Sequence, residues 1–282
     1  MLSRAPNFTF WVVIMLAVAA LPAAAEETVL SENSRPVCCR HDGSEVAQLH
    51  KNADQFYNQF KAQEAAAELR KILQIDNQNF EALVKLARAH IDIGDQIPES
   101  GVNSKERRMK EYSLAEDYAR KAVRTNPNST WGHFYVAAAL GNSAVLSPVA
   151  RQVELAEEIR RSIERSLALD ERNGFAYHAY GVWHRKMAEI GRTSRILASV
   201  FYGRQLPTGS VERSIDYFKR AMSINNNVII TRLELARSYV AAEELNSARA
   251  LLKTIPPLPN QFSDDEKHKK LALSLLDEIK DR

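Results

Sequence analysis

The residues best suited to chemistry are two histidines, His90 and His184, and an adjacent pair of cysteines, Cys38 and Cys39. A histidine can act as a general base near neutral pH, and two thiols close to His41 resemble part of a metal-ligand set. Zinc sites normally use four ligands at wider spacing, so this stretch favours no metal site. The sequence carries no GxSxG, HExxH or phosphate-loop motif. Both histidines fall at an aromatic core position of a predicted helix, so we expect no enzymatic activity and no cofactor.

The composition is that of a folded protein whose charge is nearly balanced. The 282 residues are 45% hydrophobic and 26% charged, with a net charge of +3. A charge this small gives no field for nucleic-acid binding over the whole chain. With only 10 glycines and 10 prolines for many apparent breaks, the chain favours helices over a many-stranded sheet.

The first residues have the features of a secretory signal. An apolar run of about eleven residues, shorter than the roughly twenty that span a bilayer, precedes small residues at Ala23 and Ala25. We therefore predict a signal peptide at 1–25, cleaved after Ala25, and a disordered leader at 26–44. The protein is then exported, to a periplasm or outside the cell, with no integral membrane span after cleavage. The alternative is an uncleaved signal anchor that tethers the protein to a membrane.

A repeated unit of two helices follows from residue 45 to the C-terminus. Segments around Ala65, Ala115, Ile159 and Ser214 each read as a helix, an Asp/Asn/Pro break and a second helix. Small residues recur where the two helices of a unit would approach, for example Ala87. The pattern resembles the tetratricopeptide repeat, a helix–turn–helix unit of 34 residues. We predict an all-α superhelix of about five units over 45–282, ended by a C-terminal solvating helix.

Three units carry insertions between their helices. The second has QIPESGVNSKERRMKEY, the third NSAVLSPVARQVEL, and the fourth a stretch from Gly191 to Ser210. In the fourth we predict a short helix, Ser194–Tyr202, whose apolar stripe packs against the superhelix near Phe175 and Val182. The competing interpretation is an exposed stripe that inserts into a membrane or a partner. The stripe consists of Ile196, Leu197, Val200 and Phe201.

The placement of these insertions, with "LASVFYG…LP…S" before "IDYFKRAM", resembles the regulator of microtubule dynamics family from about Asp54 to the C-terminus. The resemblance implies a non-enzymatic helical domain that in animals is associated with mitochondrial and endoplasmic-reticulum membranes and with microtubules. Those members have membrane anchors, whereas a cleavable signal is predicted for this chain. An exported product would not meet tubulin.

The repeat register assigns a set of side chains to the concave face, formed by the first helix of each unit. This candidate ligand groove is apolar with basic residues, which favours a protein or peptide partner with an acidic end near Arg88, Arg185 and Arg237. An anionic lipid or similar amphiphile is the alternative ligand. A groove filled by the insertions, as additional core, is the alternative structure. The groove residues are Arg88, Trp131, Phe134, Phe175, His178, Val182, Arg185, Lys186, Leu233 and Arg237.

Overall fold

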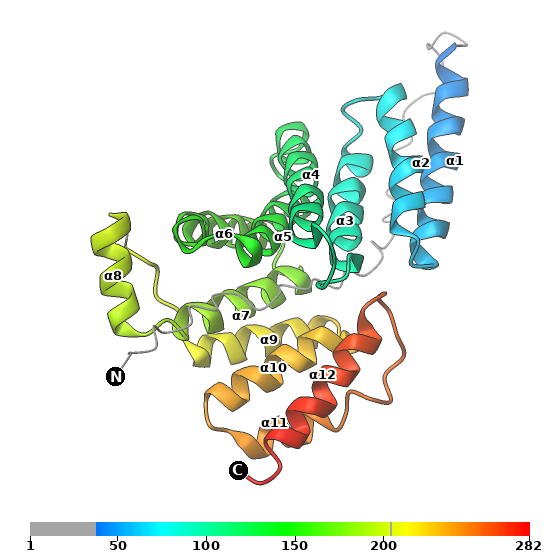
Figure 1. The fold of residues 1–282 in the computed structure, drawn as a ribbon. Coiled ribbons are helices and arrows are strands. Elements are labelled where there is room, and N and C mark those ends of the chain that lie inside the picture. Colours follow the sequence, from blue (N-terminus) through cyan, green and yellow to red (C-terminus); the bar gives the residue numbers. More distant parts are fainter. Residues whose placement is uncertain (1–37, 204) are drawn as a thin grey trace.

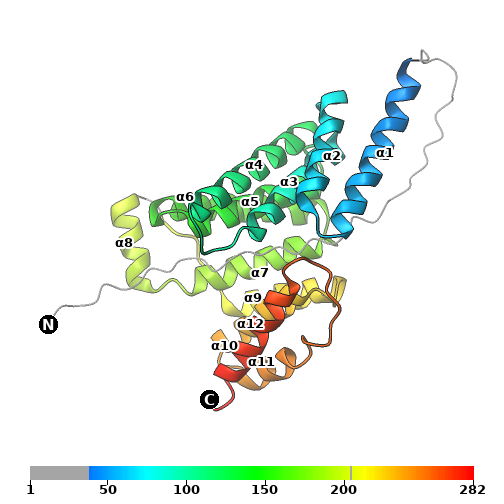
Figure 2. The ribbon, with the colours of Figure 1, turned by 45° about the vertical axis from the view of Figure 1, so that its right-hand side comes forward.

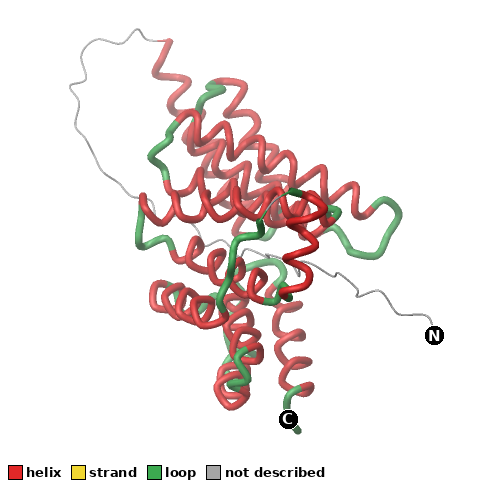
Figure 3. The backbone as a smooth tube through the Cα atoms, turned by 90° about the vertical axis from the view of Figure 1, so that its left-hand side faces the viewer, coloured by secondary structure: helices red, strands yellow, loops and turns green. Residues whose placement is uncertain are grey.

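The fold is entirely helical over the part of the chain that can be described. The computed structural model describes residues 38–203 and 205–282, and this part contains helices and loops but no strand (Figure 3). The predicted all-α class is therefore confirmed. The predicted signal peptide at 1–25, and residues 26–37 of the predicted leader, lie outside the described residues.

Five antiparallel helix pairs follow one another along the chain, as the repeat pattern predicts. Each first helix packs on the second helix of its own unit, and from α3 onward also on the second helix of the unit before it. The pairs are α1 (Cys38–Asn58) with α2 (Ala62–Ile75), α3 (Phe80–Gln96) with α4 (Ser104–Thr125), α5 (Thr130–Leu146) with α6 (Val149–Leu169), α7 (Gly174–Ala188) with α9 (Val211–Ile224), and α10 (Ile229–Ala241) with α11 (Leu245–Leu252).

The turns between units are made by short polar residues that end one helix and start the next. Asp76 and Asp170 are extended residues directly after α2 and α6. Three residues after each of them, an asparagine caps the next helix. Asn79 accepts a hydrogen bond from the amide of Ala82, and Asn173 accepts one from the amide of Ala176, both at 3.0 Å. Such side-chain caps satisfy amides that a helix start leaves without partners.

The first helices form the inner layer of a curved stack. α3 packs on α5, α5 on α7 and α7 on α10, while the second helices lie outside them. Because the stack curves, its C-terminal end comes back toward α3 (Figures 1 and 2). The hydrophobic core is continuous from α3 to the C-terminal helix, with a second cluster between α1, α2 and α3.

The three insertions have different structures. In the second and third units the added residues mainly lengthen the repeat helices: α4 begins at Ser104, and only Ser147 and Pro148 separate α5 from α6. In the fourth unit they form a separate helix, α8 (Arg192–Tyr202), at the edge of the molecule beside α6 (Figures 1 and 2). The N-terminal boundary also differs from the prediction, since α1 begins at Cys38, inside the predicted leader at 26–44.

The last helix, α12 (Asp265–Glu278), does more than cap the stack. It packs on α10 and α11, as a solvating helix should. Its first turn and the preceding loop also reach the second unit, where Lys267 forms an ion pair at 2.9 Å with Glu99 in the loop between α3 and α4. Asp264 lines a cavity together with Asp92 of α3. The C-terminal end of the superhelix is thereby connected to its second unit across the concave side.

Candidate functional site: the concave face and helix α8

The structure places the predicted groove residues on the inner helices, but it buries them. Phe134, Val182 and Leu233 are fully buried, and His178 and Arg185 are at most 4% exposed. The remaining five are partly or largely covered: Arg88, Trp131, Phe175, Lys186 and Arg237. These side chains belong to the core shared by neighbouring repeat helices, so this part of the concave face is not an open groove.

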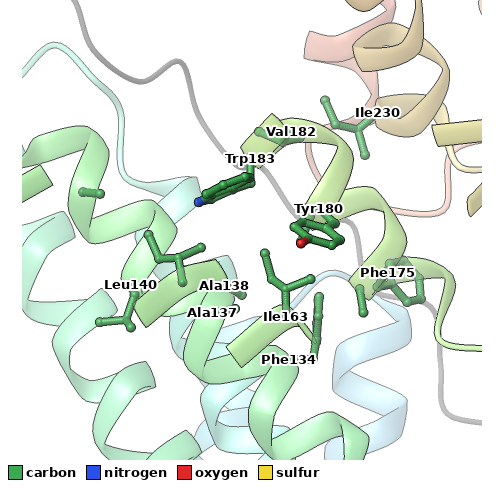
Figure 4. Packing of buried hydrophobic residues seen from close by; sticks show 14 of the residues in the cluster. Phe134, Ala137, Ala138, Leu140, Ile163, Phe175, Tyr180, Val182, Trp183 and Ile230 are labelled. Carbon is green, nitrogen blue, oxygen red and sulfur yellow. The ribbon is translucent and has the colours of Figure 1, made fainter. Parts of the chain in front are cut away.

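The aromatic groove residues are core. Trp131 lies edge-on to Phe134 with ring centroids 5.9 Å apart, and Phe175 is 6.2 Å from each of them. Figure 4 shows Phe134, Phe175 and Val182 within the packed cluster of hydrophobic side chains. Contacts of this kind between α5 and α7 hold successive units together, so these rings are not available as anchors for a peptide.

The basic residues at the C-terminal half of the groove are neutralised within the chain. Glu234 of α10, itself 1% exposed, pairs with both Arg185 and Arg237. Glu189 accepts from Arg185 at 2.7 Å and from Lys186 at 3.0 Å. Burial opposes ionisation of Glu234, but the surrounding cations, Arg185 first, lower its pKa to about 2. The predicted site for an acidic partner end at Arg185 and Arg237 is wrong, because two carboxylates of the chain already occupy it.

Neither glutamate was among the predicted site residues. Both stand at helical spacing from their partners, Glu189 four residues after Arg185 and Glu234 three before Arg237, which favours pairing on a helix surface. The link between α7 and α10 through Glu234 joins residues 49 positions apart, and no local spacing signals it.

Arg88, the third predicted cation, lies on the N-terminal half of the concave face. Its guanidinium stacks 3.5 Å from the centre of the Tyr57 ring, a cation–π contact between α1 and α3. Burial lowers the pKa of Arg88 to about 10, so it remains charged at neutral pH. Nearby, α1 and α3 border an open hollow of ≈ 680 Å³ whose lining mixes charged and apolar side chains, among them Lys51, Glu81 and Val46.

The histidines occupy core positions, as predicted from the repeat register. His184 is 3% exposed and packs against the rings of Tyr180 and Tyr217, and burial lowers its pKa to about 4. His90 is 5% exposed and its Nδ1 lies 2.7 Å from a carboxylate oxygen of Glu111. A general base needs a pKa near the working pH and access to a substrate, and His184 has neither.

The groove histidine, His178, is also held inside the protein. Its Nδ1 lies 3.0 Å from the hydroxyl of Thr231 on α10. Burial lowers its pKa to about 4, so the ring is neutral at physiological pH. It therefore links α7 to α10 as an uncharged hydrogen-bonding group.

Helix α8 is present where the sequence predicts it, but its stripe faces solvent. Gly203 ends the helix in the left-handed conformation, at φ 63°, as its position indicates. The predicted packing against Phe175 and Val182 is wrong, because α8 packs on α6 and its small side chain Ala198 provides the buried contact. The stripe residues are exposed by 57% (Ile196), 43% (Leu197), 72% (Val200) and 74% (Phe201).

Hydrogen bonds from Arg195 hold the insertion where it leaves α7 and where it returns. Arg195 donates to the carbonyl oxygens of Met187, Ile190, Leu206 and Pro207, the latter two at 3.1 and 3.0 Å. One arginine therefore holds the end of α7 and the returning segment of chain together. The return passes so close to α7 that a β-carbon at position 209 would collide with a backbone oxygen of that helix, which explains the glycine there. The apolar stripe is thus exposed on a rigidly anchored helix.

Curved stacking of five helix pairs, with capped turns between units and small residues at the helix crossings, defines a tetratricopeptide-repeat protein. The sequence model of the family described as "Regulator of microtubule dynamics protein 1-3" matches residues 49–280. The chain therefore belongs to that family. Regulator of microtubule dynamics protein 1 of Caenorhabditis elegans is 24% identical over 173 residues, which cover 61% of this chain and 76% of that protein.

Solved structures show the same fold. A thermophilic TPR protein of Thermus thermophilus aligns with a TM-score of 0.59 at 15% identity, covering 81% of this chain and 99% of that one. The pilF protein of Pseudomonas aeruginosa aligns with a TM-score of 0.51 at 14% identity, covering 85% of this chain and 93% of its own. Within the described residues, no helix is both long and apolar enough to cross a membrane.

Proposed function

We propose that this protein is a non-enzymatic tetratricopeptide scaffold that binds a partner protein, and that the apolar stripe of α8 is an anchor of that interface. The exposure of the stripe carries the proposal. Five large hydrophobic side chains of α8, the four stripe residues and Tyr202, are at least 43% exposed. Clustered exposed apolar side chains on a folded protein mark an interaction site more often than chance.

A protein partner is favoured by the geometry and charge of α8. Within the stripe, Leu197, Val200 and Phe201 stand at i, i+3 and i+4, the spacing of apolar anchors on a helix that enters a partner's groove. A helix that binds anionic membranes normally carries several basic residues on its polar face. On α8 the arginines are Arg192 and Arg195, and Arg195 uses its donors inside the chain.

The stripe alone does not make a tight complex. Covering the exposed fractions of its four side chains would contribute about 5 kcal/mol, at about 2 kcal/mol for each full side chain. The loss of translational and rotational freedom on association costs a comparable free energy. The interface therefore extends beyond α8, and α6, the helix on which α8 packs, is adjacent.

The direct test compares affinity captures from the producing cell with three forms of the full chain. Phe201→Asp places a charge in the stripe, and Val102→Asp changes an equally apolar residue that is 88% exposed elsewhere. A protein retained by the native chain and by Val102→Asp, but lost with Phe201→Asp, is the expected result. Equal capture by all three forms would contradict the proposal.

Binding to a lipid surface is the second candidate, because an exposed apolar helix also suits a membrane interface. Flotation with vesicles of zwitterionic and anionic lipids separates the two. The protein-partner proposal expects the native chain to stay at the bottom of the gradient. Flotation that Phe201→Asp abolishes would favour the membrane instead.

Export is part of the proposal and rests on the small residues at Ala23 and Ala25. The name of the Caenorhabditis elegans relative refers to microtubule dynamics, a role that an exported protein would not share. N-terminal sequencing of protein purified from the producing cell should begin at Glu26. A start at Met1 in a cytosolic fraction would refute export and would favour a partner inside the cell.

A further inference from the structure

Acidic residues from two distant segments meet where the C-terminal loop reaches α3. Asp92 and Asp95 of α3 and Asp264, just before α12, line one cavity of ≈ 20 Å³. A space of this size holds about one water molecule or one metal ion. Asp265 and His268 lie beside it in the first turns of α12. Potential ligand atoms of Asp264, Asp265 and His268 lie within 4.8 Å of one another.

The carboxylates of this cluster are close enough to oppose each other's ionisation. Burial, and then the neighbouring Asp95 and Asp264, raise the pKa of Asp92 well above its usual value. Burial raises the pKa of Asp95 to about 7, with Asp264 contributing in the same direction. Burial also raises the pKa of Asp264, although His268 opposes the shift.

Apart from His268, the basic side chains nearest to the cluster are Arg108 and Lys267, and each has another partner. Arg108 acts on Asp95, but its Nη2 donates to the hydroxyl of Tyr112 at 3.2 Å. Lys267 pairs with Glu99 at 2.9 Å. Within the cluster itself, Nε2 of His268 lies 3.5 Å from Oδ2 of Asp264, and the hydroxyl of Tyr112 donates to Oδ1 of Asp95 at 2.6 Å.

Asp265 gives an independent indication of a ligand. Its Oδ2 accepts hydrogen bonds from the amides of Gln261 and Phe262, at 2.7 and 2.9 Å, which fixes the side chain. Its Oδ1 is fully buried and accepts no hydrogen bond within the described part of the chain. That oxygen lies 3.9 Å from Nδ1 of His268, on the side of the candidate ligands. A buried carboxylate oxygen without a donor is costly unless a cation lies against it.

We propose that Asp264, Asp265 and His268 bind a divalent cation, with Asp92 of α3 as the ligand that joins the C-terminal loop to the second unit. Carboxylate oxygens with one imidazole nitrogen suit Zn²⁺ better than Ca²⁺ or Mg²⁺, which prefer oxygen ligands alone. The cation would fasten the loop before α12 onto α3 and so close the concave side. This site is independent of the partner interface on α8.

The test is calorimetric titration of ZnCl₂ into the full chain after chelator treatment, with melting temperature as a second measurement. Because thiolates also bind zinc, every form carries Cys38→Ser and Cys39→Ser. We expect one Zn²⁺ per chain, a higher melting temperature with Zn²⁺, and a smaller effect of CaCl₂ or MgCl₂. No saturable heat and no shift in melting temperature would overturn the proposal.

Three variants distinguish the site from adventitious binding. Asp264→Asn and Asp92→Asn should each weaken Zn²⁺ binding at least tenfold, with unchanged helical circular dichroism in the chelator. Asp277→Asn, near the far end of α12 and 73% exposed, should bind as the native form does. Equal affinity for Asp264→Asn and the native form would refute the site. Unchanged affinity for Asp92→Asn would refute the link to α3.

Discussion

Removing Glu234 should destabilise the protein more than any other single loss of charge on the concave face. Its side chain is 1% exposed and pairs with Arg185, which is 4% exposed, and with Arg237. Of the ion pairs that Arg185 forms within the described residues, Glu234→Ala leaves only the one to Glu189, at 2.7 Å. Breaking one partner out of a buried ion pair costs about 3–5 kcal/mol.

That loss is large enough to measure by two methods. At about 2–4 °C per kcal/mol for a domain of this size, the melting temperature should fall by roughly 6–20 °C. Urea denaturation followed by circular dichroism at pH 7 should give the corresponding shift of the midpoint. Glu189→Ala is the matched control, because that carboxylate is 42% exposed and exposed pairs contribute about 1 kcal/mol or less.

A double variant distinguishes destabilisation caused by the stranded charge from destabilisation caused by lost packing. Adding Arg185→Leu to Glu234→Ala removes the buried charge that the single variant strands, so the double variant should recover part of the stability. If Glu234→Ala costs no more than Glu189→Ala, the network is not a structural link between α7 and α10. The basic residues would then be free for a partner after all.

Three further predictions concern the insertion and the core histidine. Phe201→Asp should leave the melting temperature unchanged by calorimetry, because the ring is 74% exposed; a marked fall would show that the stripe is buried. Arg195→Met should remove the donors to four carbonyl groups and make residues 190–210 more sensitive to limited proteolysis, whereas unchanged cleavage would contradict the proposed anchoring. His184 has a folded pKa of about 4 and an unfolded value near 6.5, so the unfolded state binds the proton first and stability falls as pH drops from about 6.5 to about 4. Between pH 7 and pH 5 this group should cost about 2 kcal/mol; His184→Phe should reduce the acid loss by that amount in urea titrations, and an unaltered pH dependence would contradict the assigned pKa.

The repeat architecture was predictable from the sequence because it depends on local patterns. Small residues at helix crossings and polar breaks such as Asp76 to Asn79 recur in each unit, and the caps form as those breaks indicate. The same holds for α8. Its apolar spacing and Gly203 predict a helix of about the observed length.

The environment of α8 was not predictable in the same way. A stripe at i, i+1, i+4 and i+5 has the same sequence whether it faces a core or solvent. The outcome depends on Ala198, which gives α8 its contact, and on Arg195, which sets the angle at which the insertion leaves α7. Both act through residues that are distant in sequence or through backbone atoms, and neither leaves a periodic signal.

Prediction from the sequence was limited in the same way for the concave face. The register correctly assigns Arg185 and Leu233 to inner helices, but it contains no information on how far the stack curves. Curvature brings Glu234 onto Arg185 and the start of α12 onto the second unit. The sequence therefore identified which side chains face inward, and it could not identify their partners.

The central claim is that partners meet α8 rather than the concave face. A photo-crosslinking amino acid at Val200, 72% exposed in the stripe, can be compared in the producing cell with one at Lys51, which lines the open concave hollow. We predict a discrete protein adduct from position 200 and none from position 51. An adduct from position 51 with none from position 200 would contradict the account.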